Sequence, residues 1–142
     1  MEPRIDVFFY GSFMSLDVLR GRGFVPATWR TAVVVGYKLV FRPYATLDRA
    51  PGEVVYGIIC SATHDELRAL YAAESWLSGY EPEAVLVHAN GDAVSSALCF
   101  VAHGAGDTSP SADYIRRIAD AARQHRFPEW YIQQIVRAGD GR

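Results

Sequence analysis

The segment from Ile5 to Ser15 constrains the fold most, because an apolar run ends in a glycine turn and a helix start follows at once. The run Val7-Phe8-Phe9 favours a strand that is buried on one or both of its faces. Gly11 permits a sharp turn or a positive φ, and Ser15 predicts the N-cap of the following helix. The sequence therefore predicts a tight loop of backbone N–H groups at the end of a buried strand.

A loop of this kind can act on negative charge. N–H dipoles and a helix N-terminus that converge on one point bind anions. The same groups can stabilise a negative oxygen that forms during a reaction. An ordinary connection from strand to helix has the same spacing, so the loop alone leaves both interpretations open.

The composition indicates one globular domain over residues 1–142. Half of the residues are apolar and 13% are aromatic, which is enough for a substantial core. The 14 basic and 16 acidic residues give a net charge of −2 without a basic stripe, so we do not expect nucleic-acid binding. The N-terminal residues lack the pattern of a secretory signal, and no apolar stretch has the length of a membrane span, so no membrane association is expected.

Cys60 and Cys99 each lie within a strand-like run. We expect two buried free thiols in a reducing compartment rather than a disulfide. A packing role is favoured over a nucleophilic one, because neither cysteine has a cationic neighbour in sequence. These features together predict a cytoplasmic protein.

The middle of the chain reads mainly as strands. The segment 30–41 predicts a long strand, in which Gly36 indicates a bulge or bend. Residues 42–52 are expected to form a loop, because Pro43, Pro51 and Gly52 punctuate them. A further strand is predicted over 53–61.

The second half adds helices and a hairpin. Thr63 and Glu66 form a capping-box pattern, which opens a short helix that is expected to reach about Glu74. Irregular structure is predicted over 76–82, then strands over 83–88 and 93–101 that meet at Asn90-Gly91. Helices should start near Ser111 or Asp113 and at Pro128, and frayed residues are expected from 138 on. The sum is an α+β fold with a small curled, mostly antiparallel sheet or barrel flanked by helices.

Few residues combine into a recognisable catalytic pattern. No metal-ligand spacing, and hence no metal site, is indicated by the four histidines, which are His64, His88, His103 and His125. Ser12 follows a glycine but lacks the second glycine of a nucleophile elbow.

Glu74 follows Leu70 by four residues, so on a continuous helix it would share the leucine face and point inward. A buried carboxylate suits proton transfer near neutral pH, whereas a solvated glutamate at a helix end is the plain alternative.

Several motifs together resemble the γ-glutamylcyclotransferase-like (AIG2-like) family over nearly the whole chain. Phe9 to Met14 is similar to the family's aromatic-Tyr-Gly-Ser loop, and Ala45-Thr46-Leu47 with Val54 to Gly57 is similar to a second segment. Residues 67–80 resemble the family's leucine-rich helix that ends in its functional glutamate. Further similarity lies in Ser109-Pro110, Tyr114-Ile115 and the C-terminal helix with Pro128 and Tyr131.

This resemblance implies intramolecular acyl transfer in a small γ-glutamyl substrate. The free α-amine attacks the side-chain carbonyl, the ring closes to 5-oxoproline, and the amino acid or amine leaves. Carried over, Glu74 would be the catalytic acid and base, because an amine with a pKa near 8 must lose its proton before it attacks. The substrate-binding residues implied are Tyr10, Gly11, Ser12, Phe13, Tyr80 and Tyr114. No cofactor is implied, and a homodimer is one oligomeric state that the sequence leaves open.

The sequence also departs from the family pattern. Tyr71 stands where aspartate is frequent, Ser75 where glycine is frequent, and Phe13 where Asn or Leu is more usual. The spacing from Glu74 to Tyr80 is one residue shorter than in the classical enzymes. These changes keep three functions open: a cyclotransferase, a non-catalytic binding protein of the same fold, and hydrolysis of a γ-glutamyl amide.

Overall fold

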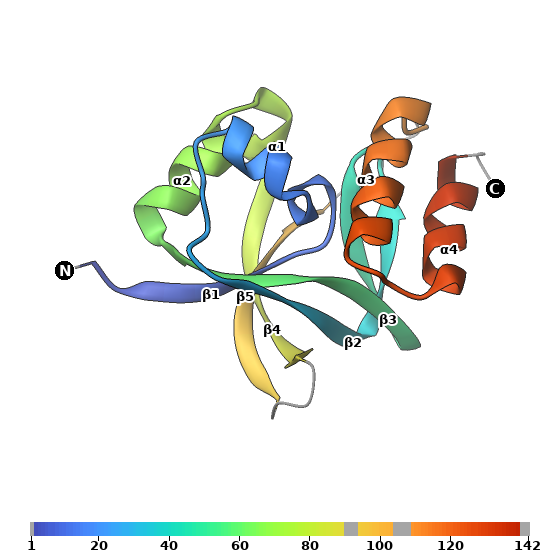
Figure 1. Cartoon of the computed structure of the whole chain (residues 1–142), viewed down its shortest axis with the longest axis horizontal. Coiled ribbons are helices and arrows are strands. Elements are labelled where there is room, and N and C mark those ends of the chain that lie inside the picture. Colours follow the sequence, from blue (N-terminus) through green and yellow to red (C-terminus); the bar gives the residue numbers. More distant parts are fainter. Residues whose placement is uncertain (1, 90–93, 104–108, 140–142) are drawn as a thin grey trace.

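A five-stranded closed barrel forms the centre of the computed structural model, which describes residues 2–89, 94–103 and 109–139. The strand order around the barrel is β1-β3-β2-β4-β5, with a parallel β1–β5 pair and antiparallel neighbours elsewhere. Figure 1 shows α1 and α2 together on one side, and α3 with α4 on the other. The strands are β1 (Arg4–Phe9), β2 (Trp29–Phe41), β3 (Ala45–Thr63), β4 (Tyr80–Ala89) and β5 (Ser95–Ala102). This confirms the predicted fold class.

Strand β1 separates the two hydrophobic clusters of the core. Its residues alternate between faces, as strand geometry requires. Val7 and Phe9 pack into a cluster with α1 (Leu16–Gly21) and α2 (His64–Ala72), whereas Phe8 belongs to a larger cluster with α3 (Ala112–Gln124) and α4 (Glu129–Gly139). The strand was predicted to be buried on one or both faces, and the structure shows that both faces are buried.

The long β2–β3 hairpin corrects one expectation. Gly36 has a φ of +90°, and the register shifts between Val35 and Tyr37, so the predicted bulge is present. However, residues 45–52 are strand rather than loop, because β3 starts at Ala45 and pairs with β2 from Phe41 backwards. Pro51 and Gly52 are exposed within β3, where a missing ladder bond is tolerated.

The helix starts were predicted well from local signals. Ser15 accepts a hydrogen bond from the Val18 N–H, and Ser111 accepts one from the Tyr114 N–H. The capping box at Thr63 is complete, because Glu66 also bonds back to the Thr63 N–H. The last helix follows Pro128 and runs to Gly139, beyond the predicted start of fraying.

The segment after α2 differs from the prediction. The helix ends at Ala72, and the short 3-10 helix η2 (Ser75–Gly79) follows where irregular structure was expected. β4 then begins at Tyr80 and pairs with β5, as the hairpin prediction requires, while Asn90-Gly91 itself lies outside the described residues.

Cys60 and Cys99 are buried and free, as expected. In the described part of the chain, no helix is both long and apolar enough to cross a membrane.

Candidate functional site

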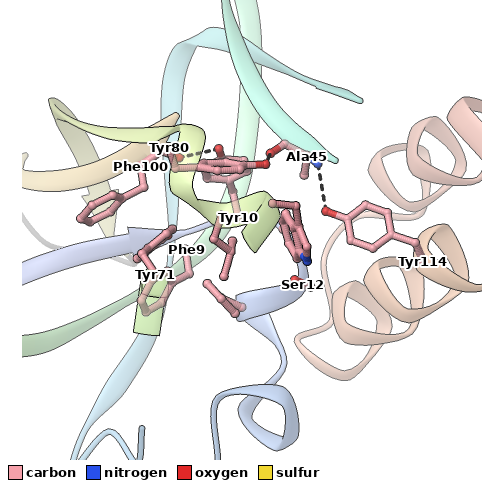
Figure 2. A pocket seen from close by; sticks show the side chains of 12 residues that line it. Phe9, Tyr10, Ser12, Ala45, Tyr71, Tyr80, Phe100 and Tyr114 are labelled. Carbon is pink, nitrogen blue, oxygen red and sulfur yellow. Dashed lines mark hydrogen bonds between the residues drawn. The ribbon is translucent and has the colours of Figure 1, made fainter. Parts of the chain in front are cut away.

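A pocket lies where the loop after β1 meets the start of β3, the η2 segment and α3. Figure 2 shows its side chains, most of which are aromatic. Its cavity volume is about 30 Å³, which is room for about one water molecule. Of the described residues that line it, none is charged. They are Phe9, Tyr10, Gly11, Ser12, Phe13, Ala45, Tyr71, Trp76, Leu77, Tyr80, Phe100 and Tyr114.

The predicted loop forms one wall of this pocket. Ser12 to Met14 make the 3-10 helix η1, in which the Met14 N–H bonds to the Gly11 carbonyl at 3.0 Å. The first N–H groups of such a helix have no acceptor within it, so those of Ser12 and Phe13 are the donors that the loop offers. The expected tight loop is therefore present at the end of a buried strand.

Gly11 is needed here for space rather than for an unusual φ. Its φ is −107°, so the positive φ that the sequence allowed is not used. A Cβ at this position would lie 3.0 Å from the Cβ of Ala45. The loop thus approaches β3 closely, and this contact brings it to the hydrogen bonds that Ala45 makes.

A hydrogen-bonded chain through Ala45 joins two of the predicted tyrosines. The Ala45 N–H donates to the Tyr114 hydroxyl at 2.9 Å, and the Tyr80 hydroxyl donates to the Ala45 carbonyl at 2.5 Å (Figure 2). Because the Tyr114 oxygen already accepts, its O–H proton is the group that it can offer to a ligand. The structure therefore places both tyrosines at the pocket, the position that the family resemblance implied, and directs both hydroxyls at one backbone position.

The phenols at this site stay protonated over the physiological range. Burial raises the pKa of Tyr114 to about 12. It also raises the pKa of Tyr10, Tyr71 and Tyr80 above the usual value, because a phenolate loses its hydration in apolar surroundings. Each hydroxyl is therefore a hydrogen-bond donor or acceptor at neutral pH rather than an anion.

Tyr10 and Phe13 lie deeper than a simple binding loop suggests. The Tyr10 hydroxyl donates to the Phe100 carbonyl at 2.6 Å, which ties the loop to β5. Phe13 is buried and meets Tyr71 edge to face at 5.5 Å between centroids. Tyr71 in turn stacks on Phe100 with 4.1 Å between ring centroids. Two of the three positions that depart from the family pattern, Phe13 and Tyr71, therefore belong to the aromatic wall.

A stacked pair lies beside the pocket. Trp76 of η2 stacks on Tyr44 with 4.0 Å between ring centroids and an interplanar angle of 22°. Tyr44 stands directly before Ala45, in a turn that the ion pair between Arg42 and Asp48 supports. Sequence reasoning singled out neither ring as part of the site, and their only sequence signal was a high local content of aromatic residues.

Glu74 is not on the apolar side of the helix, so of its two interpretations the structure supports the solvated glutamate at a helix end. Its side chain is 45% exposed and accepts a hydrogen bond from Arg22 Nη1 at 3.1 Å. The helix ends at Ala72, so the four-residue spacing from Leu70 no longer sets the direction of the side chain. Arg22 also lies over the ring of Phe13, 5.6 Å from its centroid. Glu74 is therefore connected to the pocket through Arg22 and Phe13, and it does not line it.

Comparison with known proteins gives both a family and a fold. The family model described as "Gamma-glutamyl cyclotransferase, AIG2-like" matches residues 7–117. None of the curated proteins matches the sequence significantly.

Solved structures reproduce the whole fold at low sequence identity. One described as "Gamma-glutamyl cyclotransferase" has a TM-score of 0.77 at 19% identity and covers 94% of this chain and 86% of that chain. YkqA from Bacillus subtilis has a TM-score of 0.80 at 22% identity, covering 98% of this chain and 55% of its own. A yeast γ-glutamyl cyclotransferase described as specific to glutathione has a TM-score of 0.68 at 12% identity, with 97% and 96% covered.

Proposed function

The chain belongs to the AIG2-like γ-glutamyl cyclotransferase family, and from this premise we propose that it converts a small γ-glutamyl amino acid or amine into 5-oxoproline and the free amine. The observation that carries the proposal is the pocket wall in which the Tyr10–Phe13 loop and the Tyr114 hydroxyl converge beside Ala45. Backbone N–H groups and a protonated phenol suit the carboxylate of a γ-glutamyl group.

The chemistry needs one bound molecule to fold on itself. The α-amino nitrogen forms a bond to the γ-carbonyl carbon, and the bond from that carbon to the leaving nitrogen breaks. One proton leaves the attacking ammonium, and one is delivered to the departing amine. Ring closure within a single molecule gains mainly from orientation, which a pocket built from fixed donors and aromatic rings can supply.

Glu74 is the proton carrier in this proposal. It must leave Arg22 and reach the pocket, because its carboxylate is half exposed in the present arrangement. A partly exposed ion pair is worth about 0.2–1 kcal/mol, so breaking the pair with Arg22 costs little. The pocket must also widen, since a cavity of about 30 Å³ is too small for a γ-glutamyl group. Movement of the η2 segment, which follows Glu74 directly, would serve both needs.

The test is 5-oxoproline release from a panel of γ-glutamyl amino acids and amines by wild type and Glu74→Gln. We expect the variant to lose about 100-fold or more in kcat, while it keeps its unfolding transition and ligand affinity. Glu53→Gln, at an exposed position on β3, is the matched control and should retain full activity. Full activity in Glu74→Gln would overturn the assigned role.

A second function is favoured by one observation, the Arg22–Glu74 pair itself. In this alternative, Glu74 stays at the surface, and the protein binds small molecules in the pocket without turning them over. This alternative predicts ligand binding by calorimetry and no 5-oxoproline across the panel, with wild type and Glu74→Gln binding equally well.

A further inference from the structure

A second cavity adjoins the pocket on its α2 side. We call it the α2 groove. It lies between α2, η2, β4 and β5, and its volume is about 640 Å³, within the range of ligand sites. The two cavities share four residues, so they lie side by side. These are Tyr71, Leu77, Tyr80 and Phe100.

The chemistry of the groove is apolar with a basic edge. Leu67 and Leu98 join the shared rings as its apolar lining, while His64 and Arg68 contribute basic groups from α2. Of the described residues that line it, none is an aspartate or glutamate. Arg68 uses Nη1 to bond Asp65 at 2.7 Å, which is one of the five N–H donors of a guanidinium.

We propose that the α2 groove binds the leaving-group half of the substrate, and that this half is an apolar amino acid whose carboxylate lies toward Arg68. The proposal rests on the proposed cyclotransferase function. It follows from continuity, because the small pocket and the α2 groove share a wall, and Leu77 of that wall belongs to η2, the segment that moves in the proposed function. The atoms beyond the scissile amide then enter the larger space.

The lining of the groove selects among leaving groups. The nitrogen of a γ-glutamyl amine belongs to the uncharged scissile amide, so the leaving half of such a substrate offers no carboxylate for Arg68 to bind. An apolar side chain gains from the same rings, and a carboxylate is the natural partner of an arginine. The groove thus distinguishes γ-glutamyl amino acids from γ-glutamyl amines, which the pocket alone does not.

Three substrates that differ in one group each test this selection. They are γ-glutamyl-leucine, γ-glutamyl-glycine and the γ-glutamyl amide of 3-methylbutylamine, which is the leucine compound without its carboxylate. For wild type we expect kcat/KM on the leucine compound to exceed that on the glycine compound about 10-fold. It should exceed that on the amine compound about 5-fold. Equal values on all three would overturn the proposal.

Arg68→Gln assigns the carboxylate effect to one side chain. It should lower kcat/KM about 5-fold for γ-glutamyl-leucine and leave the amine compound unchanged. Arg123→Gln is the matched control, because Arg123 pairs with Asp120 three residues earlier on an exposed face of α3. It should change neither value. An equal loss on both substrates in Arg68→Gln, or no loss on either, would contradict the role of Arg68.

Calorimetric titration distinguishes failure of the proposed cyclotransferase function from failure of the proposal for the α2 groove. If wild type released no 5-oxoproline from any of the three compounds, calorimetric titration would be run on the same proteins. Tighter binding of γ-glutamyl-leucine than of its amine analogue, lost in Arg68→Gln, would support the groove without turnover. Equal binding of the two compounds, or no binding, would overturn it.

Discussion

The two sides of the pocket are built differently. On the side of α3 and β3, the Tyr114 hydroxyl, the Ala45 backbone and the Tyr80 hydroxyl form consecutive hydrogen bonds, and Ala45 is 4% exposed. On the side of η2, the Trp76 ring stacks on Tyr44, and Glu74 forms an ion pair with Arg22 at the surface.

The two sides of the pocket differ in how much free energy it costs to exchange their contacts. Buried hydrogen bonds hold their groups in one arrangement, because breaking one without a replacement leaves a polar group unpaired and away from water. A ring stack and a partly exposed ion pair can be exchanged for contacts with solvent or ligand at small cost. The α3 side is thus the constrained part of the pocket, and the η2 side is the part whose contacts can be exchanged at small cost.

Among the variants that test this comparison, Tyr114→Phe is expected to have the largest effect on stability and activity. It removes the acceptor of the buried Ala45 N–H, so the free energy of unfolding should fall by about 1–3 kcal/mol. It also removes the hydroxyl offered to the ligand, so kcat/KM should fall about 10-fold or more. Urea unfolding and steady-state kinetics measure the two effects.

Tyr37→Phe is the control for Tyr114→Phe. Tyr37 contacts Arg49 through its ring, and that contact survives the change, so less than about 0.5 kcal/mol should be lost. If the Tyr114 variant were as stable as this control, the fixed side of the pocket would be less constrained than its hydrogen bonds indicate.

Trp76→Ala tests the adaptable side at intermediate magnitude. It removes the stack on Tyr44, and we expect a loss of roughly 1 kcal/mol of stability because the indole is only partly buried. KM should rise about 5-fold with little change in kcat, since the indole contributes contact area rather than a reacting group. Trp130→Ala on α4, half exposed and distant in sequence, should leave KM unchanged. A fall in KM in Trp76→Ala would mean that Trp76 obstructs entry instead.

The smallest effect is expected from Arg22→Gln. The ion pair with Glu74 is partly exposed, at 21% for Arg22 and 45% for Glu74, so its loss should change stability by less than about 1 kcal/mol. Freed from the pair, Glu74 should enter the pocket more readily, and kcat/KM should rise up to about 5-fold. A loss of activity greater than 10-fold would show that Arg22 holds Glu74 in its productive place.

Local signals in the sequence were sufficient for much of the fold. The caps at Ser15, Thr63 and Ser111 depend on a hydroxyl and a backbone N–H a few residues away, and all three are present. The bulge at Gly36 depends on one residue that accepts a positive φ. The strand over 45–52 was missed because pairing with β2 outweighs the turn preference of its proline and glycine.

The site was less accessible from sequence than the fold. The Tyr10–Phe13 loop was found because it combines a strand end with a glycine turn, and Tyr80 and Tyr114 were found through family resemblance. Glu74 was placed by helical spacing that ends before it, at Ala72. Contacts such as that of Gly11 with Ala45 depend on the barrel closing around them, which no local pattern encodes.

The parallel pairing of β1 with β5 has a consequence for how the protein is made. Tyr10 and Phe100, which share a hydrogen bond, are 90 residues apart in the chain. During synthesis β1 can pair with β3 first, but the barrel cannot close until β5 has been made, and a nascent chain that stops before β5 has no complete pocket. Contacts of such long range slow folding. A ligand that binds only the closed barrel adds its binding free energy to that late step, so the substrate itself would act as a stabiliser of the newly finished chain.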